Sequence, residues 1–474
     1  MAELADEKPT IAHPDVEEDE EFTQAEQRKI IHKVDRRLLV ILGFMQAVSF
    51  LDRANMSNAA VAGMTQDLQL GVESRYSIVL LVFFAPYVAL QLPASILVRK
   101  IGPRLFLSSI VFCWGIVMMC FGFVQNWKSF IVLRLLLGGL EAGCFPGQYY
   151  LISCWYSRFD LYKRTSIFYL LGVLGSASGG VLGLGFSQMK GLAGCNGWRW
   201  LFIMEGILTI LIGIAGFIFT ADFPDQAHKV WGFLTEQESA FIIRRINRDR
   251  QDAETSSFSM GRFLRPALDA KVWGFALIFF CSTMQAYSVG FFLPIILKQK
   301  LGFTEAQAQG LSTPPYLVAM ILMFVQGWLS DKIRLRSPML YVNACICIIG
   351  LCLLAWGGAA GVQYLGAILV TAGCSANPPT VMVFQANNIR GNWKRAFCSA
   401  SMIGFGGTGG IAGSLVFRSR DAPHYLPGIY SCLTANGIIL ITTTVLVLYF
   451  IRQNRLSEQG KIVIEELPGF RYTI

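Results

Sequence analysis

Five ionisable side chains stand well inside the apolar segments of this sequence, all in its N-terminal half: Asp52, Arg53, Arg134, Glu141 and Glu205. A charge near the centre of a bilayer is costly unless it is paired or faces water, so such residues are candidates for function. They can bind an anion, exchange a proton or pair with one another. The histidines lie outside the apolar segments, and the cysteines form no CxxC pair with metal-ligand spacing. The protein is therefore predicted to have no metal site and not to be an enzyme.

Arg134 and Glu141 are separated by about two helical turns, which places them on one face of a helix. The segment that carries them reaches Glu141 at a depth similar to that of Asp52 and Arg53 in the first apolar segment. We therefore expect an ion pair between Arg53 and Glu141. In this hypothesis protonation of Glu141 releases Arg53 to hold an anionic substrate. Burial raises a carboxyl pKa and a nearby cation lowers it, so either acid, Asp52 or Glu141, is a candidate for proton exchange. The alternative is that the charges only lock helices together or gate the outer mouth.

Glu205 comes shortly after Arg199, and we expect a structural ion pair between the two. The C-terminal half carries only neutral polar residues in its apolar segments, which indicates that the first half handles protons and the second half shapes a substrate pocket. The candidate anion-binding residues beside Arg53 are Tyr87, Gln285, Tyr287, Tyr316, Gln385 and Asn387. An aromatic residue in such a segment, taken alone, is more typical of packing.

Membrane-spanning helices are the elements that must position these residues. Of the 474 residues, 54% are hydrophobic and only 15% are charged, against about 25% charged residues in a soluble domain, and the mean hydropathy is +0.49. Apolar segments of about 20 residues match the roughly 30 Å of hydrocarbon that a helix must cross. We predict an all-α polytopic membrane protein of about twelve spans in two pseudo-symmetric six-helix bundles, at residues 38–60, 76–98, 105–124, 129–153, 165–189, 199–220, 272–296, 310–329, 338–358, 362–386, 396–417 and 427–451.

Lysine and arginine are distributed unequally between the loops. One side of the predicted membrane holds twelve of them in its short loops and the other side holds eight. The terminal flanks and the polar middle segment fall on the richer side, so both termini are predicted to be cytosolic. The net charge of +9 comes from short clusters at the ends of apolar segments, a pattern that does not indicate a nucleic-acid partner.

The predicted organisation is a disordered cytosolic tail (1–36), a first bundle (37–221), a cytosolic middle loop (222–270), a second bundle (271–452) and a cytosolic tail (453–474). In the middle loop, Thr235 and Glu238 form a capping-box pattern, followed by the apolar residues Phe241, Ile242 and Ile246. This pattern predicts an amphipathic helix, either on the inner membrane face or as a solvated linker.

Two segments at corresponding places in the two halves are rich in small residues. One carries Gly175, Gly179 and Gly183, and the other carries Gly406, Gly410 and Ser414. Small residues every four positions let helix backbones approach closely. The matching segments predict two parallel repeats.

Several motifs resemble one known family. They are the runs 51–55 (LDRAN), 197–202 (GWRWLF) and 327–332 (GWLSDK), the pair Glu205-Gly206, and the set Arg134, Gly138 and Glu141. Together they resemble the anion:cation symporter branch of the major facilitator superfamily, especially the fungal allantoate and nicotinate permeases, from about Lys33 to Arg455. One departure is the loop after the second span, where the superfamily usually has an acid and this chain has Pro93-Ala94-Ser95 before Arg99-Lys100. Asp331 keeps that acid in the second half.

The resemblance implies a role for each matching residue. Asp52 and Glu141 are the expected proton carriers, Arg53 engages the anion, and Arg134 is the family's span-four arginine. We assign Arg134, Glu205 and Asp331 to gating or structure. The resemblance also implies a monomer in the plasma membrane that uses the proton gradient, without a cofactor, to move a monocarboxylate, a ureido acid or a vitamin such as nicotinate or pantothenate.

Proton-coupled uptake of a small organic anion is the leading hypothesis, with the anion, protons and membrane lipid as the partners. Proton-driven efflux of a fungal metabolite uses the same acids and remains an alternative. A non-transporting nutrient sensor that signals through its tails and middle loop is an alternative of a different class.

Overall fold

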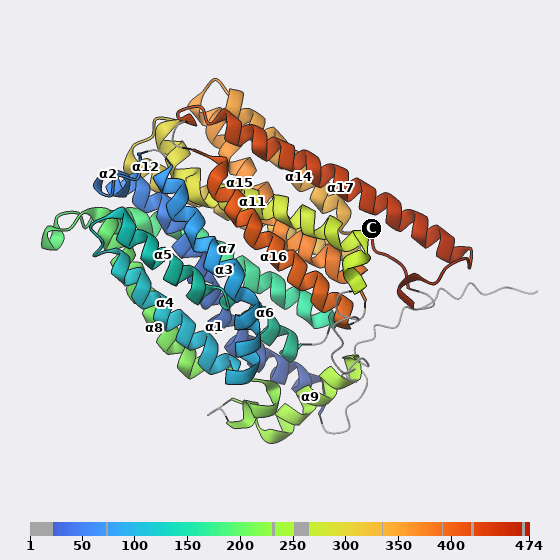
Figure 1. Cartoon of the computed structure of the whole chain (residues 1–474). Coiled ribbons are helices and arrows are strands. Elements are labelled where there is room, and N and C mark those ends of the chain that lie inside the picture. The colour runs from blue at the N-terminus through green and yellow to red at the C-terminus, as the bar shows by residue number, and fades with distance from the viewer. Residues whose placement is uncertain are drawn as a thin grey trace, which may run out of the picture.

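The structure is a computed structural model that describes residues 22–72, 74–156, 158–229, 233–250, 265–333, 335–390, 392–418, 421–466 and 470–474. Within these residues the chain is a bundle of long helices (Figure 1). The long helices are α1 (Gln24–Ala59), α3 (Arg75–Ile101), α4 (Pro103–Phe121), α5 (Trp127–Glu141), α6 (Cys144–Trp155), α7 (Arg158–Ser187), α8 (Gly197–Phe219), α11 (Ala270–Gln299), α13 (Thr313–Ile333), α14 (Ser337–Trp356), α15 (Ala360–Asn388), α16 (Asn392–Val416) and α17 (Leu426–Glu458). The shorter elements are the π-helical turn η1 (Ala60–Met64), α2 (Thr65–Asp67), α9 (Glu236–Arg250), α12 (Glu305–Gly310) and the 3-10 turns η2 (Leu192–Gly194), η3 (Pro224–Lys229), η4 (Arg265–Leu268) and η6 (Ile464–Glu466).

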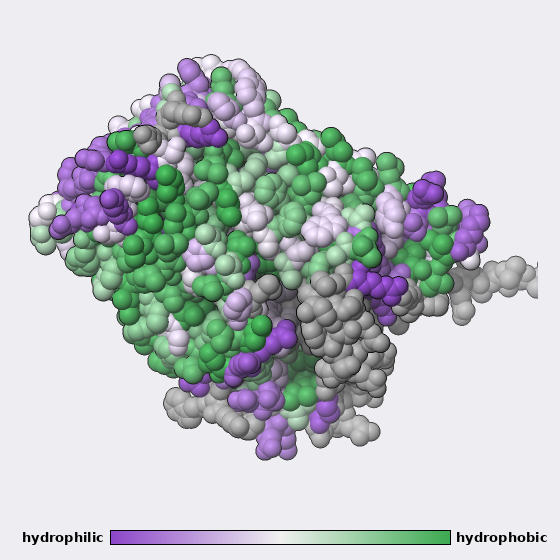
Figure 2. Space-filling view, viewed as in Figure 1, coloured by the Kyte–Doolittle hydropathy of each residue, from purple (hydrophilic) through white to green (hydrophobic). Residues whose placement is uncertain are grey.

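A helix occupies each predicted span, and the pair α5 and α6 shares the span 129–153. Nine helical segments of the described residues are long and apolar enough to cross a membrane, and α3 makes a tenth if its two parts, bent by 54°, count as one span. Figure 2 shows the surface that such spans require, with apolar residues along the sides of the bundle and hydrophilic residues gathered toward its ends. The predicted all-α polytopic membrane fold is confirmed.

Glycines bring neighbouring helices into close contact within each half. A Cβ atom on Gly175 of α7 would lie 2.0 Å from the backbone oxygen of Ala47 on α1. In the second half, a Cβ atom on Gly413 of α16 would lie 2.6 Å from the backbone oxygen of Met284 on α11. Only glycine allows such an approach, so the glycine-rich segments pack α7 on α1 and α16 on α11 in the same way.

The same two helices also join the halves to each other. A Cβ atom on Gly180 of α7 would lie 2.5 Å from the backbone oxygen of Gln309 on α12, and α7 also packs along α13. A Cβ atom on Gly410 of α16 would lie 2.1 Å from the ring of Phe84 on α3. Helices α7 and α16 therefore occupy corresponding places in the two halves, as repeats require.

The bundle has two different ends. The terminal end holds the start of α1, the end of α17 and helix α9, and the distal end holds α2 and α12 (Figure 1). Toward the distal end the halves are joined by hydrogen bonds, from the Ser57 hydroxyl to the backbone oxygen of Gly290 at 3.0 Å and from Lys298 Nζ to that of Val61 at 2.9 Å. The distal end is therefore closed.

Helix α9 begins at the predicted capping box. The N–H of Thr235 donates to Glu238 Oε2 at 2.8 Å, and the N–H of Glu238 donates to Thr235 Oγ1 at 3.2 Å. The apolar residues that follow are buried against α1 and α6: Phe241, Ile242 and Ile246. The predicted amphipathic helix is therefore present, and it packs on the bundle through its apolar face.

Helix α1 begins at Gln24, well before the predicted span. The Thr23 N–H donates to Glu26 Oε2 at 2.9 Å, and this capping box starts the helix ahead of the apolar segment. The part of the predicted disordered tail that precedes residue 22 lies outside the described residues. Its remainder, from Gln24 onward, is helical.

The predicted C-terminal tail is folded onto the second half. Lys271 Nζ donates to Glu465 Oε1 at 2.5 Å, and Lys394 Nζ donates to the same oxygen at 2.8 Å. The ring of Tyr472 stacks on Phe450 with the centroids 4.6 Å apart. The segment therefore ties α11, α16 and α17 together at the terminal end.

We expect the substitution Glu465→Gln to destabilise the fold by about 1–3 kcal/mol, because two lysines lose a shared charged acceptor. Thermal unfolding of the detergent-purified protein measures the loss. Glu458→Gln is the control, since Glu458 is exposed near the end of α17. Equal melting temperatures for the two variants would contradict the expectation.

The same contact predicts a pH dependence. Burial raises the pKa of Glu465, but hydrogen bonds and charge from Lys271 and Lys394 outweigh it, so the pKa is lowered. A carboxyl group of this kind stabilises the fold above its unfolded pKa of about 4.3, and that stabilisation is lost as the pH falls through the folded pKa. The difference in melting temperature between wild type and Glu465→Gln should therefore shrink below about pH 4.

Candidate functional site

Arg53 lies on α1 at the seam between the two halves. Its Nη2 donates to Glu141 Oε1 on α5 at 2.7 Å, and its Nη1 donates to the hydroxyl of Tyr287 on α11 at 2.9 Å. The side chain of Arg53 is 13% exposed and that of Glu141 is 2% exposed. The predicted ion pair between Arg53 and Glu141 is confirmed, and Arg53 also connects the first half to the second.

The local sequence explains how Glu141 reaches Arg53. A Cβ atom on Gly138, one turn before Glu141, would lie 2.1 Å from the backbone oxygen of Phe83, so glycine lets α5 approach α3 here. Helix α5 ends at Glu141, before α6 begins. Ser49, one turn before Arg53, donates to the same Glu141 oxygen. Ser49 was not among the predicted site residues, although its spacing of four residues from Arg53 places both on one helix face.

Aromatic rings surround the Arg53 guanidinium. Its Cζ lies 5.2 Å from the ring centroid of Tyr287, 5.3 Å from that of Phe50 and 5.8 Å from that of Tyr87. These distances allow cation–π contacts, which contribute about 0.5–2 kcal/mol each. The structure therefore brings two of the predicted anion-binding residues, Tyr87 and Tyr287, to Arg53 from opposite halves.

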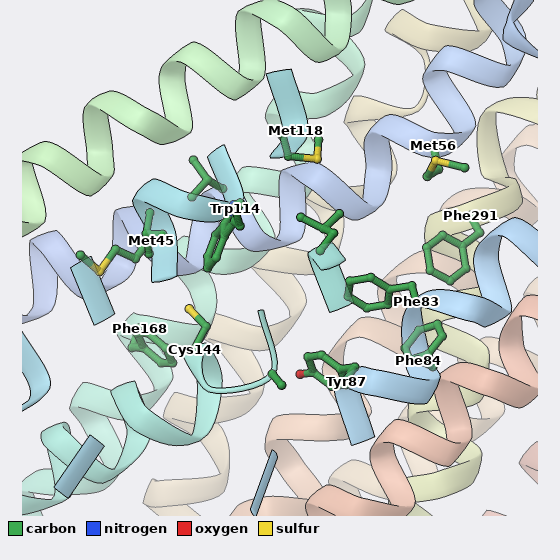
Figure 3. Close-up of a cluster of buried hydrophobic side chains, with 14 of the residues drawn as sticks. Met45, Met56, Phe83, Phe84, Tyr87, Trp114, Met118, Cys144, Phe168 and Phe291 are labelled. Atoms are coloured by element: carbon green, nitrogen blue, oxygen red, sulfur yellow. The ribbon is translucent and has the colours of Figure 1, made fainter. Parts of the chain in front are cut away.

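An aromatic group packs on the distal side of Arg53. Figure 3 shows Phe83, Phe84 and Tyr87 of α3 together with Phe291 of α11. Phe83 stacks on Tyr87 at 5.4 Å, and Phe84 meets Phe291 edge-on at 6.1 Å. This group closes the seam between the halves beyond Arg53.

Tyr169 of α7 is a neighbour of Arg53 that was not among the predicted site residues. Its ring meets Phe50 edge-on at 5.6 Å, and it lies within electrostatic range of Arg53 and Tyr287. The sequence spacing could have indicated Tyr169, because it stands three residues before Gly172 and so lies on the same face of α7. In the structure Gly172 packs against Phe50. Tyr169 continues the face that α7 turns toward α1.

Two predicted pocket residues of the second half are engaged elsewhere. The Oε1 of Gln285 accepts a 2.8 Å bond from Asn436 on α17, and the Nε2 of Gln385 donates to the backbone oxygen of Cys398 at 2.9 Å. Buried amides need partners, and these two find theirs within the second half. The structure does not bring them to Arg53.

The remaining predicted site residues of the second half stand apart. Asn387 is exposed near the terminal end of α15. Tyr316 is half-buried on α13 and faces α11, where a Cβ atom on Gly290 would lie 3.9 Å from its hydroxyl. Asp331 belongs to α13, and its side chain lies outside the described residues.

Two further charged side chains of the first half, Asp52 and Arg134, are buried near Arg53 and Glu141. Asp52 is 2% exposed and Arg134 is 3% exposed. Arg134 is within electrostatic range of Asp52 and Glu141, and its guanidinium stands 5.3 Å from the ring centroid of Phe121. The four predicted residues Asp52, Arg53, Arg134 and Glu141 therefore form one buried cluster.

The predicted ion pair between Glu205 and Arg199 is wrong. Arg199 Nη1 donates to the backbone oxygens of Gly122 at 2.9 Å and Val124 at 2.7 Å, in the loop between α4 and α5. Glu205 is fully buried, and neither carboxylate oxygen has a hydrogen-bond partner among the described residues. Six residues along a helix turn the side chain about 240°, so the two residues point in different directions.

Known proteins with similar sequences and folds share this architecture. The sequence model of the Major Facilitator Superfamily matches residues 42–414, which is most of both halves. The chain belongs to the Major Facilitator Superfamily. Its curated relatives are named as transporters, so this member of the superfamily is a multi-pass membrane transporter and not an enzyme.

Several fungal relatives match nearly the whole chain. It is 31% identical over 414 residues to the MFS-type transporter cnsO of Penicillium expansum, covering 85% of this chain and 79% of the relative. It is 28% identical over 471 residues to the major facilitator-type transporter hxnP of Emericella nidulans, covering 95% and 94%. It is 27% identical over 442 residues to the high-affinity nicotinic acid transporter of Saccharomyces cerevisiae, covering 93% and 80%.

The fold is similar to that of a solved bacterial transporter. A bacterial homologue of the human lysosomal transporter Spinster, in an inward-facing and occupied conformation, superposes with a TM-score of 0.64. The superposition covers 86% of this chain and 95% of that one at 14% identity. At this identity the likeness shows the fold alone.

We expect Tyr287→Phe to loosen the closed distal end of the transporter. The substitution removes the 2.9 Å bond from Arg53 to α11, and a hydrogen bond of this kind contributes about 0.5–1.5 kcal/mol. Pulsed spin-label distances between unnatural amino acids at the exposed positions Gln66 and Ala306 measure the opening.

Tyr316→Phe is the matched control for this experiment. It removes a tyrosine hydroxyl on the second half for which the described residues show no hydrogen bond to the first half. The longer distances should gain population in Tyr287→Phe alone. If both variants keep the wild-type distance distribution, the bond to Arg53 does not hold the halves together.

Proposed function

We propose that this transporter moves a small organic anion together with protons by alternating access. The observation that supports the proposal is the buried pair of Arg53 and Glu141 at the seam, bonded on its other side to Tyr287. An arginine stays charged even when buried, and its planar fork of donors matches a carboxylate. Intramembrane charges of this kind mark substrate and ion pathways in transporters.

Glu141 and an anionic substrate compete for the same guanidinium. While Glu141 is ionised it occupies Arg53 Nη2 at 2.7 Å, and an arriving anion meets a second negative charge. A proton on Glu141 removes that charge and frees Arg53 to make charge-assisted bonds to the anion. Proton and anion then favour each other's binding, and such linkage is the thermodynamic basis of symport.

Binding at Arg53 also acts on the contact between the halves. The same side chain donates to Tyr287 of the second half, so an anion that draws Arg53 away changes the stability of the closed distal end. A ligand shifts a conformational equilibrium by its difference in affinity for the two states. Arg53 is placed to supply that difference.

The proposed cargo is a monocarboxylate, a ureido acid or a vitamin such as nicotinate or pantothenate. The rings of Phe50, Tyr87 and Tyr287 face the guanidinium, and a flat carboxylate between them would meet a cation and aromatic faces together. A relative at 27% identity is the high-affinity nicotinic acid transporter of Saccharomyces cerevisiae, which supports this class.

We also propose a monomer in the plasma membrane with both termini in the cytosol. The excess of basic residues in the loops of the terminal end supports this orientation. The closed distal end then faces the outside. Asp52 and Glu141 are the proposed proton carriers, and Arg134 and Asp331 are proposed as gating or structural charges.

We expect Glu141→Gln to abolish accumulation driven by a proton gradient while leaving exchange of labelled anion across the membrane. Glutamine keeps the size of the side chain but cannot bind or release a proton. The measurement is uptake of labelled carboxylates, nicotinate among them, into vesicles with an imposed pH gradient. Normal accumulation by Glu141→Gln would sink the coupling role proposed for this residue.

We expect Arg53→Ala to weaken anion binding by at least about tenfold, because one charge-assisted contact in a buried site contributes about 1.5–3 kcal/mol. Binding of labelled nicotinate to the purified protein measures the loss. Arg75→Ala is the control, since Arg75 lies at the start of α3 with its guanidinium 5.0 Å from the ring centroid of Trp127, away from the seam. Equal binding by both variants would show that Arg53 is not the anion receptor.

The direction of transport is tested in vesicles of known orientation. Symport concentrates the labelled anion on the side toward which protons flow. Accumulation on the opposite side would replace symport with proton-driven efflux.

A further inference from the structure

One buried amide of α1 takes no part in the contacts described so far. Gln46 is 1% exposed, and neither its Nε2 nor its Oε1 has a hydrogen-bond partner among the described residues. Buried side-chain amides are as a rule hydrogen-bonded, and one without a partner destabilises the fold. Gln46 therefore offers two donors and an acceptor that the described residues do not engage.

Gln46 lies on the face of α1 that carries the site. It precedes Ser49 by three residues and Phe50 by four, the spacings of neighbours on one helix face. The packing of α7 agrees with this spacing. A Cβ atom on Gly172 would lie 3.1 Å from Gln46 Cγ and 3.3 Å from the ring of Phe50. Gln46 and Phe50 therefore meet the same point of α7.

The Arg53 side chain extends back along α1 toward Gln46. Its Nη2 donates to Ser49 Oγ at 3.4 Å, so the guanidinium lies at the level of the preceding turn. Gln46 stands three residues before Ser49, a rise of about 4.5 Å along the helix. Gln46 is therefore about one turn from the guanidinium, on the side of the terminal end, where α1 begins (Figure 1).

Protein covers the two sides of Arg53 unequally. Toward the distal end, Phe84 and Phe291 close the seam with their rings 6.1 Å apart (Figure 3). Toward the terminal end, Phe50 and Tyr169 are only half-buried, and their rings meet edge-on at 5.6 Å. An anion bound to Arg53 would therefore extend toward the terminal end, along the Phe50 ring and toward Gln46.

We infer that Gln46 is a specificity-determining residue, which binds a hydrogen-bonding ring atom of a cargo whose carboxylate is held by Arg53. The inference rests on the proposed function and narrows the cargo to heteroaromatic monocarboxylates. In this arrangement the ring packs on Phe50, and Gln46 Nε2 donates to a ring acceptor such as a pyridine nitrogen. A site built to hydrogen-bond its ligand rejects an analogue that lacks the bonding atom.

The test compares nicotinate with benzoate, which has the same shape and charge but a C–H group in place of the ring nitrogen. Binding of each labelled acid to the purified wild type should favour nicotinate by about threefold to tenfold, the effect of one hydrogen bond. In Gln46→Leu the preference should be lost or reversed, because the ring nitrogen then leaves water without a partner. A preference that Gln46→Leu keeps, or equal binding of the two acids by wild type, would overturn the inference.

Gln326→Leu is the matched control. Gln326 is also a buried amide, on α13 of the second half, where its Nε2 donates to Asn343 Oδ1 at 2.6 Å. The substitution removes an amide of the same size from a contact within that half, so the variant should keep the wild-type ratio of the two affinities. Loss of the nicotinate preference in both variants would point to general damage to the bundle and contradict a role for Gln46.

Thermal unfolding without cargo gives a second test that needs no ligand. Replacing an unpartnered buried amide by an apolar side chain of similar size removes a destabilising group, so Gln46→Leu should raise the melting temperature. Gln326→Leu should lower it, because Asn343 loses its partner. A melting temperature that Gln46→Leu does not raise would show that the amide is already bonded in the cargo-free protein, for instance to an internal water, and would overturn the inference.

Failure of the proposed function gives a different result. Wild type would then bind neither acid, or Arg53→Ala would bind both as tightly as wild type does. Either result would remove the proposed cargo class and the inference with it. Failure of the inference alone leaves both acids bound through Arg53 and changes only the part played by Gln46.

Discussion

The cost of leaving charge uncompensated in hydrocarbon is the constraint on which the rest of this structure depends. The first half buries Asp52, Arg53, Arg134, Glu141 and Glu205 in one region. Only Arg53 and Glu141 satisfy each other directly, at 2.7 Å. The helices around them are arranged accordingly, because Gly138 brings α5 to α3 and the glycine face of α7 brings that helix to α1. Close backbone packing at these glycines therefore allows the charged side chains to lie near one another.

The second half has the same helical architecture but a different set of buried polar groups. It contains no buried acid in its described spans, and some of its buried amides pair with one another, as Gln285 does with Asn436 at 2.8 Å and Gln326 with Asn343 at 2.6 Å. Its contribution to the charged region is the hydroxyl of Tyr287. A half whose described spans bury no acid can move against the other without uncovering a carboxylate to lipid. The asymmetry between the repeats therefore separates charge handling from movement.

The sequence was sufficient to predict the positions of the spans and the pairing of Arg53 with Glu141, because both follow from constraints that every membrane helix obeys: length, and compensation of charge at equal depth. It was insufficient where the answer depends on the rotation of a helix about its axis. The side chain of Gln285 points to Asn436, that of Glu205 points away from Arg199, and Tyr169 lies near Arg53. Apolar spans with small residues on several sides leave that rotation open, and only packing against neighbours fixes it. The fold of the C-terminal segment, held by Glu465, depends on long-range partners that no local pattern reveals.

The contacts that close the distal end are of a kind that permits reopening. The Ser57 hydroxyl and the Tyr76 hydroxyl donate to backbone oxygens of α11 at 3.0 and 3.1 Å. Each such bond contributes about 0.5–1.5 kcal/mol net, and water can replace it when the halves part. A buried ion pair between the halves would behave differently, since separating it exposes two bare charges at a cost of about 3–5 kcal/mol. Arg53 keeps its ion pair within the first half and offers the second half a neutral hydroxyl. The charge stays compensated while the seam remains breakable, and a carrier that must alternate between two states requires both.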